Sequence, residues 1–184
     1  ACVDCVHAAA RGFDTGAISL AMVEGSALGG GFEAALAHHF ILAQHDARMG
    51  FPEIAFNLFP GMGGYSLVAR RSGMRLAEEL IYKGESHTAE WYHNHGLVDT
   101  LFEPGRGYQA ARTLIDTFRT RINGIRAMLR ARSRVMQLPR AELMDITEDW
   151  VDAAFSLEPR DIGYMERLVM LQDRHVATAI RKAS

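Results

Sequence analysis

The stretch Val23-Glu24-Gly25-Ser26-Ala27-Leu28-Gly29-Gly30-Gly31-Phe32-Glu33 decides the fold that this sequence predicts. An apolar run over residues 17–23 leads into it and is typical of a buried strand. Residues 32–37 favour a helix with an acidic side chain, Glu33, in its first turn. Three consecutive glycines inside a helix would cost about 2–3 kcal/mol relative to alanine, so we expect them at the junction instead. Bare backbone between a strand and a helix exposes N–H groups that suit an anion, or an oxygen that becomes negative during a reaction.

The composition is that of an ordinary globular chain. Its 184 residues fit one domain, and a hydrophobic content of 48% is enough for a core. The formal net charge of −2 indicates no basic patch of the kind that binds nucleic acid, and no run of 18 apolar residues could span a membrane. We therefore expect neither nucleic acid nor a membrane as a partner. The chain opens on Ala1 with no initiator methionine and no signal-like segment, so we expect an N-terminal part of the protein to be missing.

Cys2 and Cys5 are the only cysteines of the chain. Their C-x-x-C spacing could mark a redox or metal site, but the second pair of ligands that a zinc site needs is missing. We expect no metal site, and we predict that both thiols are small core residues on one face of a helix. Such sparse use of cysteine suits a reducing compartment and predicts a cytoplasmic protein.

The pattern of the chain changes near residue 104. Before it, strands and helices alternate, which is typical of an α/β fold, and after it nearly all residues to 181 are helical in pattern. Breaks are expected at Asn123-Gly124, Pro139 and Pro159, which would give about four helices. We divide the chain into residues 1–104 and 105–184. The predicted strands cover residues 17–24, 40–44, 47–51 and 97–102, and the predicted helices of the first region cover residues 1–12, 31–38, 65–71, 76–83 and 88–96.

Two familiar motifs match the glycine stretch by letter but not by context. Gly29-x-Gly31-x-x-Ala34 resembles a dinucleotide-binding fingerprint, but its first glycine lies too far from the end of the strand. Ser26 lacks the G-x-S-x-G spacing of a nucleophilic serine, so we interpret it as a turn residue.

Two glutamates provide the clearest chemical signal. Glu33 alone could simply compensate a helix dipole, and Glu53, in the apolar segment Phe51-Pro52-Glu53-Ile54, could be a solvated loop residue. Together, beside an N–H-rich glycine stretch, they provide what proton transfer next to a developing oxyanion requires.

Three linked motifs resemble the enoyl-CoA hydratase (crotonase) superfamily. They are Ala27-Leu28-Gly29-Gly30-Gly31-Phe32-Glu33, Met49-Gly50-Phe51-Pro52-Glu53 and Phe59-Pro60-Gly61-Met62-Gly63-Gly64. The resemblance runs from about residue 15 to 103. It implies a crotonase (ClpP-like) ββα-spiral core at 1–104, with its N-terminal part missing, followed by a C-terminal helical cluster that covers the active site and forms subunit contacts.

The ends of the chain resemble one branch of that superfamily, the bacterial diffusible-signal-factor synthases. The segments that carry this resemblance are residues 1–8, 144–152 and 165–169. These enzymes make a cis-2-unsaturated fatty-acid quorum-sensing signal from a 3-hydroxyacyl carrier-protein thioester, and then release the free acid. An ordinary enoyl-CoA hydratase/isomerase of fatty-acid metabolism, and a non-catalytic crotonase-fold protein that binds a partner, are the alternatives.

The resemblance also assigns roles to residues. Glu33 and Glu53 would be the catalytic acid and base, with Glu53 acting at C2 and Glu33 at C3, although the assignment of the two stays open. The N–H of Gly30 would form half of the oxyanion hole, and the N–H of Gly61 would hold the water or hydroxyl. The other oxyanion donor would come from upstream of Ala1, so the chain alone is expected to be incomplete.

The remaining expectations concern the substrate and the partners. Leu28 and Gly29 would contact the substrate, and Trp150, Phe155 and Met170 could line an acyl pocket, although apolar residues at helical spacing are also typical of a core or an interface. The acyl group would be carried on acyl carrier protein or coenzyme A, with no bound cofactor. The resemblance implies a trimer or hexamer, and restraint by the receiver domain of a sensor kinase.

Overall fold

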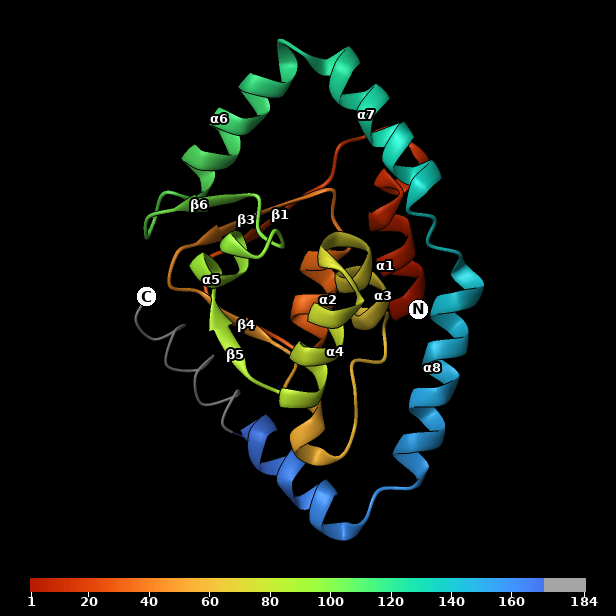
Figure 1. The fold of residues 1–184 in the computed structure, drawn as a ribbon. Helices are drawn as coiled ribbons and strands as arrows, with labels where there is room; N and C mark the ends of the chain where they lie inside the picture. The colour runs from red at the N-terminus through yellow and green to blue at the C-terminus, as the bar shows by residue number, and fades with distance from the viewer. Residues whose placement is uncertain (171–184) are drawn as a thin grey trace.

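The computed structural model describes residues 1–170, and these form a small α/β core with helices around it (Figure 1). The two sheets and the helices α1 to α5 lie at the centre, while α6, α7 and α8 follow one another around its outside (Figure 1). The predicted α/β fold with a helical C-terminal region is confirmed. Anything predicted for residues 171–184 lies outside the described residues.

One of the two sheets of the core is parallel. It has the order β1-β3-β6, with strands Leu20–Val23, Phe40–Gln44 and Thr100–Phe102. Leu20 pairs with Phe40, and Leu42 pairs with Thr100. The central strand β3 is buried on both faces, which explains why it reads as a continuous apolar run rather than an alternating one. The strand expected over residues 97–102 is shorter than predicted and begins at Thr100.

A second sheet holds the glycine stretch in place. Its order is β2-β4-β5, with strands Ala27–Leu28, Arg48–Gly50 and Ser86–Thr88. The pair β2–β4 is parallel and the pair β4–β5 is antiparallel. Strands β2 and β5 were not predicted, because two or three residues are too few to show an alternating pattern. Their pairing lets the Gly29 N–H donate to the Gly50 carbonyl at 2.9 Å, just past the end of β2.

Aromatic packing joins the first helices to the sheets. Phe32 is fully buried, with its ring centroid 5.0 Å from that of Phe51 and 4.8 Å from that of Tyr92. Two helix ends carry residues typical of caps: the Thr88 hydroxyl accepts the Trp91 N–H, and Gly84 has a left-handed backbone. The elements of this region are α1 (Cys2–Ala10), η1 (Gly12–Asp14), α2 (Gly30–Leu36), η2 (Pro52–Phe56), α3 (Gly64–Ser72), α4 (Met74–Lys83) and α5 (Ala89–Asn94).

The C-terminal helices are α6 (Gly107–Arg119), α7 (Ile122–Val135) and α8 (Arg140–Phe155), followed by a helix that begins at residue 159. The breaks expected near Pro139 and Pro159 are confirmed. The break expected at Asn123-Gly124 is wrong, because both residues lie in the first turn of α7 and the chain turns before them. The N–H groups of a first turn have no intrahelical partner in any sequence, so that turn accepts poor helix formers.

The cysteine prediction is also wrong. Cys2 and Cys5 are exposed, because α1 turns Val3, Val6 and Ala9 toward the core instead. Within the part of the chain that the structure describes, no group of three or more histidine, cysteine, aspartate or glutamate side chains is placed to hold a metal ion. Among these residues no helix is both long and apolar enough to cross a membrane.

We predict that Phe32→Ala lowers the free energy of unfolding by about 3–5 kcal/mol, because it empties a closely packed aromatic site. Urea unfolding followed by circular dichroism measures the change. The matched control is Phe155→Ala, which removes a phenyl ring that is 87% exposed and should change stability by about 0.5 kcal/mol or less. Equal losses in the two variants would contradict the assigned core.

Candidate active site

Glu33 lies inside the protein at the start of α2. It is only 2% exposed, and one of its oxygens, Oε1, accepts the backbone N–H groups of Met62 and Gly64, each at 2.8 Å. Gly64 is the first residue of α3, so this oxygen lies at the positive end of a helix dipole. Burial raises the pKa of Glu33, and the two N–H bonds oppose that rise without cancelling it.

The backbone that surrounds Glu33 requires glycine at two positions. Gly29, the residue before α2, has φ 56° and ψ −125°, and Gly63, the residue before α3, has φ 107°. Positive φ values of this kind are costly for residues with a Cβ atom. A Cβ atom at Gly63 would also collide with the side chain of Leu143 from α8. Gly29 and Gly63 therefore set the backbone path on either side of the Glu33 carboxylate, and with it the directions of the nearby N–H groups.

Glu53 is the second carboxylate of the site and lies in η2. Burial raises its pKa to about 7, and the negative charge of Glu33 adds to the rise. Its Oε2 is buried with no hydrogen-bond partner within the described part of the chain. Its Oε1 lies against the backbone of Gly29, where a Cβ atom would come within 2.5 Å of it. Gly29 is thus the point at which the glycine stretch reaches Glu53, while Glu33 lies four residues later on α2.

Gly30 begins α2 and has an unused backbone donor. No hydrogen bond from its N–H is found among residues 1–170, as expected for the first position of a helix. A Cβ atom at Gly30 would lie 2.8 Å from the Met62 methyl group, so a larger residue would have to push the end of that side chain aside. The Gly30 N–H, which is expected to bind an oxyanion, therefore has no partner among residues 1–170 and lies where the Met62 side chain packs closely.

Helix α8 covers the segment that carries Gly61. The Thr147 hydroxyl donates to the Gly61 carbonyl at 2.8 Å, and the Trp150 ring packs so closely that a Cβ atom at Gly61 would lie 2.5 Å from its Cγ. A bidentate ion pair links α8 to α3: Arg70 Nη1 donates to Glu142 Oε1 at 2.8 Å, and Arg70 Nη2 donates to Glu142 Oε2 at 2.6 Å. The sequence argument missed Leu143 and Thr147. Their spacing with Trp150, at i, i+4 and i+7, is the helical signal that could have identified them.

The other residues predicted for the site are placed in two ways. Leu28 and Gly29 border it through β2 and the start of α2, and Trp150 lies against Gly61. Phe155 and Met170 are 87% and 58% exposed, so neither side chain is packed into the described core. The acyl-pocket role proposed for these two residues has no contact in residues 1–170 to support it.

The raised pKa of Glu53 predicts how stability depends on pH. The folded state binds the Glu53 proton more tightly than the unfolded state does. The resulting stabilisation of the fold is complete below about pH 4.5 and is lost as the pH rises through about 7. Between pH 5 and pH 8, the wild type should lose up to about 3 kcal/mol of unfolding free energy relative to Glu53→Gln, which does not titrate.

Urea unfolding at the two pH values measures this difference. Glu90→Gln is the matched control, because Glu90 is an exposed glutamate on α5, and it should follow the wild type. A Glu53→Gln variant that loses stability in parallel with the wild type would contradict the buried, protonated carboxyl.

Comparison with known proteins identifies the family of the chain and shows how much of its relatives' length the chain covers. The model of the enoyl-CoA hydratase/isomerase family matches residues 10–158. The chain is 41% identical over 86 residues to a peroxisomal fatty acid beta-oxidation multifunctional protein of Arabidopsis thaliana, covering 47% of this chain and 12% of that protein. It is 41% identical over 83 residues to the 2,3-dehydroadipyl-CoA hydratase of Escherichia coli (strain K12), covering 45% of this chain and 32% of that enzyme.

A solved structure agrees with these matches. The enoyl-CoA hydratase of Mycobacterium tuberculosis H37Rv superposes with a TM-score of 0.58 at 35% identity, over 71% of this chain and 54% of that one. The chain thus spans about a third of the length of the single-function curated relative, and a smaller share of the multifunctional one.

Proposed function

Because the chain belongs to the enoyl-CoA hydratase/isomerase family, we propose that it supplies the two carboxylates of an active site that adds water to 2-enoyl thioesters or removes it from 3-hydroxyacyl thioesters. The observation that carries the proposal is the meeting of Glu33, Glu53 and the free Gly30 N–H at one glycine stretch. The acyl group would be carried on coenzyme A or an acyl carrier protein, and the reaction needs no further cofactor.

Each carboxylate has an environment that suits one half of the dehydration. Glu53, with a pKa of about 7, takes the C2 proton of the 3-hydroxyacyl group as its carboxylate. Glu33 in its protonated form gives a proton to the departing 3-hydroxyl, and its raised pKa favours that form. Both N–H bonds to Glu33 go to Oε1, which leaves Oε2 for the proton. Hydration of the enoyl group uses the same two residues in the opposite protonation states.

The thioester oxygen gains negative charge as the C2 proton leaves, and the Gly30 N–H is placed to stabilise it. A donor of this kind lowers the barrier by about 3–4 kcal/mol in comparable sites. We propose that the second donor comes from a segment outside these 184 residues. The activity is therefore to be assayed with that segment present.

Neutralising either acid should remove the activity. Glu33→Gln and Glu53→Gln should each lower the turnover of crotonyl-CoA by about 10²–10⁴-fold, because each removes one proton transfer and keeps the side-chain shape. The loss of the conjugated enoyl-thioester absorbance measures the rate, and circular dichroism checks the fold. Glu90→Gln, on the exposed surface, should stay within about twofold of the wild type. A near-normal rate in either active-site variant removes the role given to that residue.

The pH dependence should report Glu53 in the dehydration direction. Its carboxylate form is required there together with protonated Glu33, so kcat/KM for a 3-hydroxyacyl thioester should follow a bell-shaped pH profile. Deprotonation of Glu53 near pH 7 gives the rising limb, and loss of the Glu33 proton gives the falling limb. The measurement is initial rate at low substrate between pH 5.5 and 8.5. A profile that is flat over this range would mean that another group removes the C2 proton.

The finer form of the proposal is synthesis of a cis-2-unsaturated fatty-acid signal from a 3-hydroxyacyl carrier-protein thioester, with release of the free acid. It is supported by the resemblance in residues 144–152, which form much of α8 and carry Thr147 and Trp150 onto Gly61. Release of the acid would use water activated by the same carboxylates. Product analysis separates the candidates: free cis-2 acid supports the synthase, whereas 3-hydroxyacyl-CoA formed from a trans-2-enoyl-CoA, with no free acid, supports the ordinary hydratase.

A non-catalytic role is less well supported, because both carboxylates are present, Glu33 is buried and Glu53 is partly buried. Assembly into trimers or hexamers, restraint by a receiver domain and a cytoplasmic location stay predictions of the sequence. Three curated relatives carry peroxisomal in their names.

A further inference from the structure

A cavity of about 1020 Å³ lies away from the two glutamates, among α1, the end of α2, α3 and α7. Neither Glu33 nor Glu53 lines it. Eight arginines line it, and Asp14 is the single carboxylate among its described lining residues. This accumulation of positive charge is unexpected in a chain whose formal net charge is −2.

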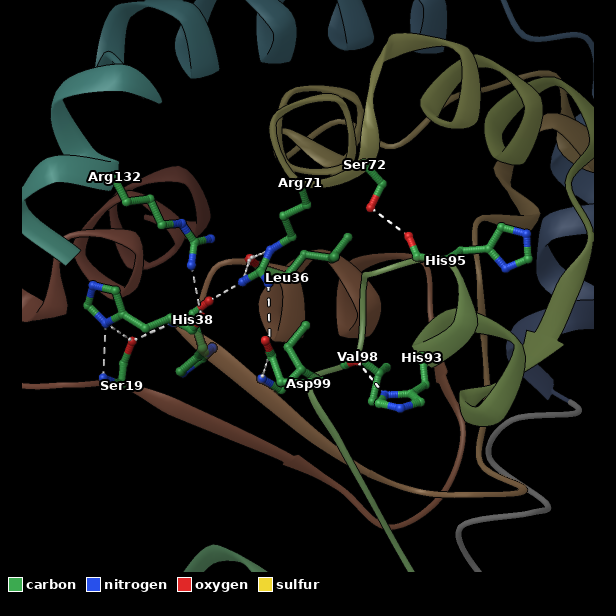
Figure 2. Close-up of polar contacts among 12 residues, drawn as sticks. Ser19, Leu36, His38, Arg71, Ser72, His93, His95, Val98, Asp99 and Arg132 are labelled. Atoms are coloured by element: carbon green, nitrogen blue, oxygen red, sulfur yellow. Dashed lines mark hydrogen bonds and ion pairs between the residues drawn. The ribbon is translucent and has the colours of Figure 1, made fainter. Parts of the chain in front are cut away.

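Some of these arginines have a structural role that explains them. Figure 2 shows Arg71 extending from α3 toward the end of α2, where it donates to the carbonyls of Leu36 and His38 and lies 4.0 Å from Asp99. Arg132, from α7, donates to the His39 carbonyl at 3.1 Å (Figure 2). These two side chains satisfy carbonyl groups at the last residue of α2 and in the segment that follows it. Three others, Arg11, Arg70 and Arg140, pair with carboxylates.

Helix α7 contributes three arginines that have no such explanation. Arg126, Arg130 and Arg134 all line the cavity and are exposed, and none has a carboxylate partner within residues 1–170. Their spacing of four places them on one face of the helix, about 6 Å apart along its axis. Like charges at this spacing destabilise a helix, and α7 contains no acidic residue that would offset them.

The interior of the cavity also carries positive potential. His39 lies on its wall, and its pKa is lowered by burial and by the nearby charges of Arg132 and Arg71. Its Nδ1 accepts the Ser19 N–H at 3.0 Å, which is a role for a neutral imidazole. His39, one of three histidines on the wall, is therefore held in its neutral form beside the guanidinium groups of Arg71 and Arg132.

We propose that this cavity binds a nucleotide-sized molecule that carries two or more phosphate groups. Its volume suits a small-molecule site, and a concave wall favours such a ligand over the flat face of an acidic protein. The planar forks of Arg126 and Arg130 match phosphate oxygens in geometry as well as in charge. The proposal does not depend on the proposed function, because neither catalytic carboxylate takes part.

Isothermal titration of the protein with ATP and with inorganic pyrophosphate tests the proposal. Both should bind, adenosine should not, and affinity should fall as the salt concentration rises from 50 to 200 mM. The double variant Arg126→Gln/Arg130→Gln should weaken ATP binding at least about tenfold, because each lost guanidinium removes charged hydrogen bonds. The matched control is Arg112→Gln/Arg121→Gln, which removes the same charge from exposed positions outside the cavity and should stay within twofold.

A competition arm identifies the source of the phosphates. Displacement of bound ATP by 3′,5′-ADP would assign the cavity to the phosphate end of coenzyme A, and resistance to it would assign it to a separate nucleotide; both outcomes support a phosphate site. Equal weakening in the two double variants would show non-selective attraction and overturn the proposal. So would absence of ATP and pyrophosphate binding, including the case in which an acidic polypeptide binds instead. Thermal unfolding of each variant checks that the fold is retained.

Discussion

The structure depends on the pair of hydrogen bonds that two backbone N–H groups give to one buried oxygen of Glu33. A carboxylate removed from water is expensive unless donors replace its hydration, and here the donors come from Met62 and Gly64, about thirty residues away in sequence. That replacement works only if the segment carrying the donors has a fixed shape. The glycines of this segment, Leu143 and Thr147 of α8, and the Arg70–Glu142 pair all contribute to that shape.

The two carboxylates are unequal because their surroundings are unequal. Glu33 has donors on one oxygen, whereas Glu53 has a buried oxygen with no partner in the described residues and a backbone wall at Gly29. Burial outweighs a backbone hydrogen bond and raises the pKa of Glu53 to about 7, so this carboxyl changes its protonation near neutral pH. The link between them is the pairing of β2 with β4, which places Gly29 beside the end of β4 and so beside the start of η2.

The sequence predicted what local patterns encode. Strand β3, the cap at Thr88 and the two glutamates of the candidate site could all be identified from spacing, turn chemistry and motif. What could not be predicted depends on distant contacts. Strands β2 and β5 exist because β4 lies between them, and the donors to Glu33 come from a turn whose direction is set by α8. The exposed thiol of Cys2 shows the same limit, since a C-x-x-C spacing gives a helical face but not the side of the helix that faces the core.

Net charge is a poor guide to this molecule, because its charges are separated in space. Four arginines and no acidic residue lie on α7, while its neighbour α8 carries glutamates and aspartates along most of its length. A sum of −2 hides that arrangement, and a prediction made from the sum finds no basic surface. Arg132 of α7 and Arg71 of α3 donate to carbonyl groups near the end of α2, whereas Arg126, Arg130 and Arg134 line the cavity as exposed side chains. The same physical rule applies at both sites: a buried or crowded charge needs a counterpart. Glu33 finds its counterpart in backbone N–H groups, and these three arginines have none among residues 1–170, which is why they point to a ligand.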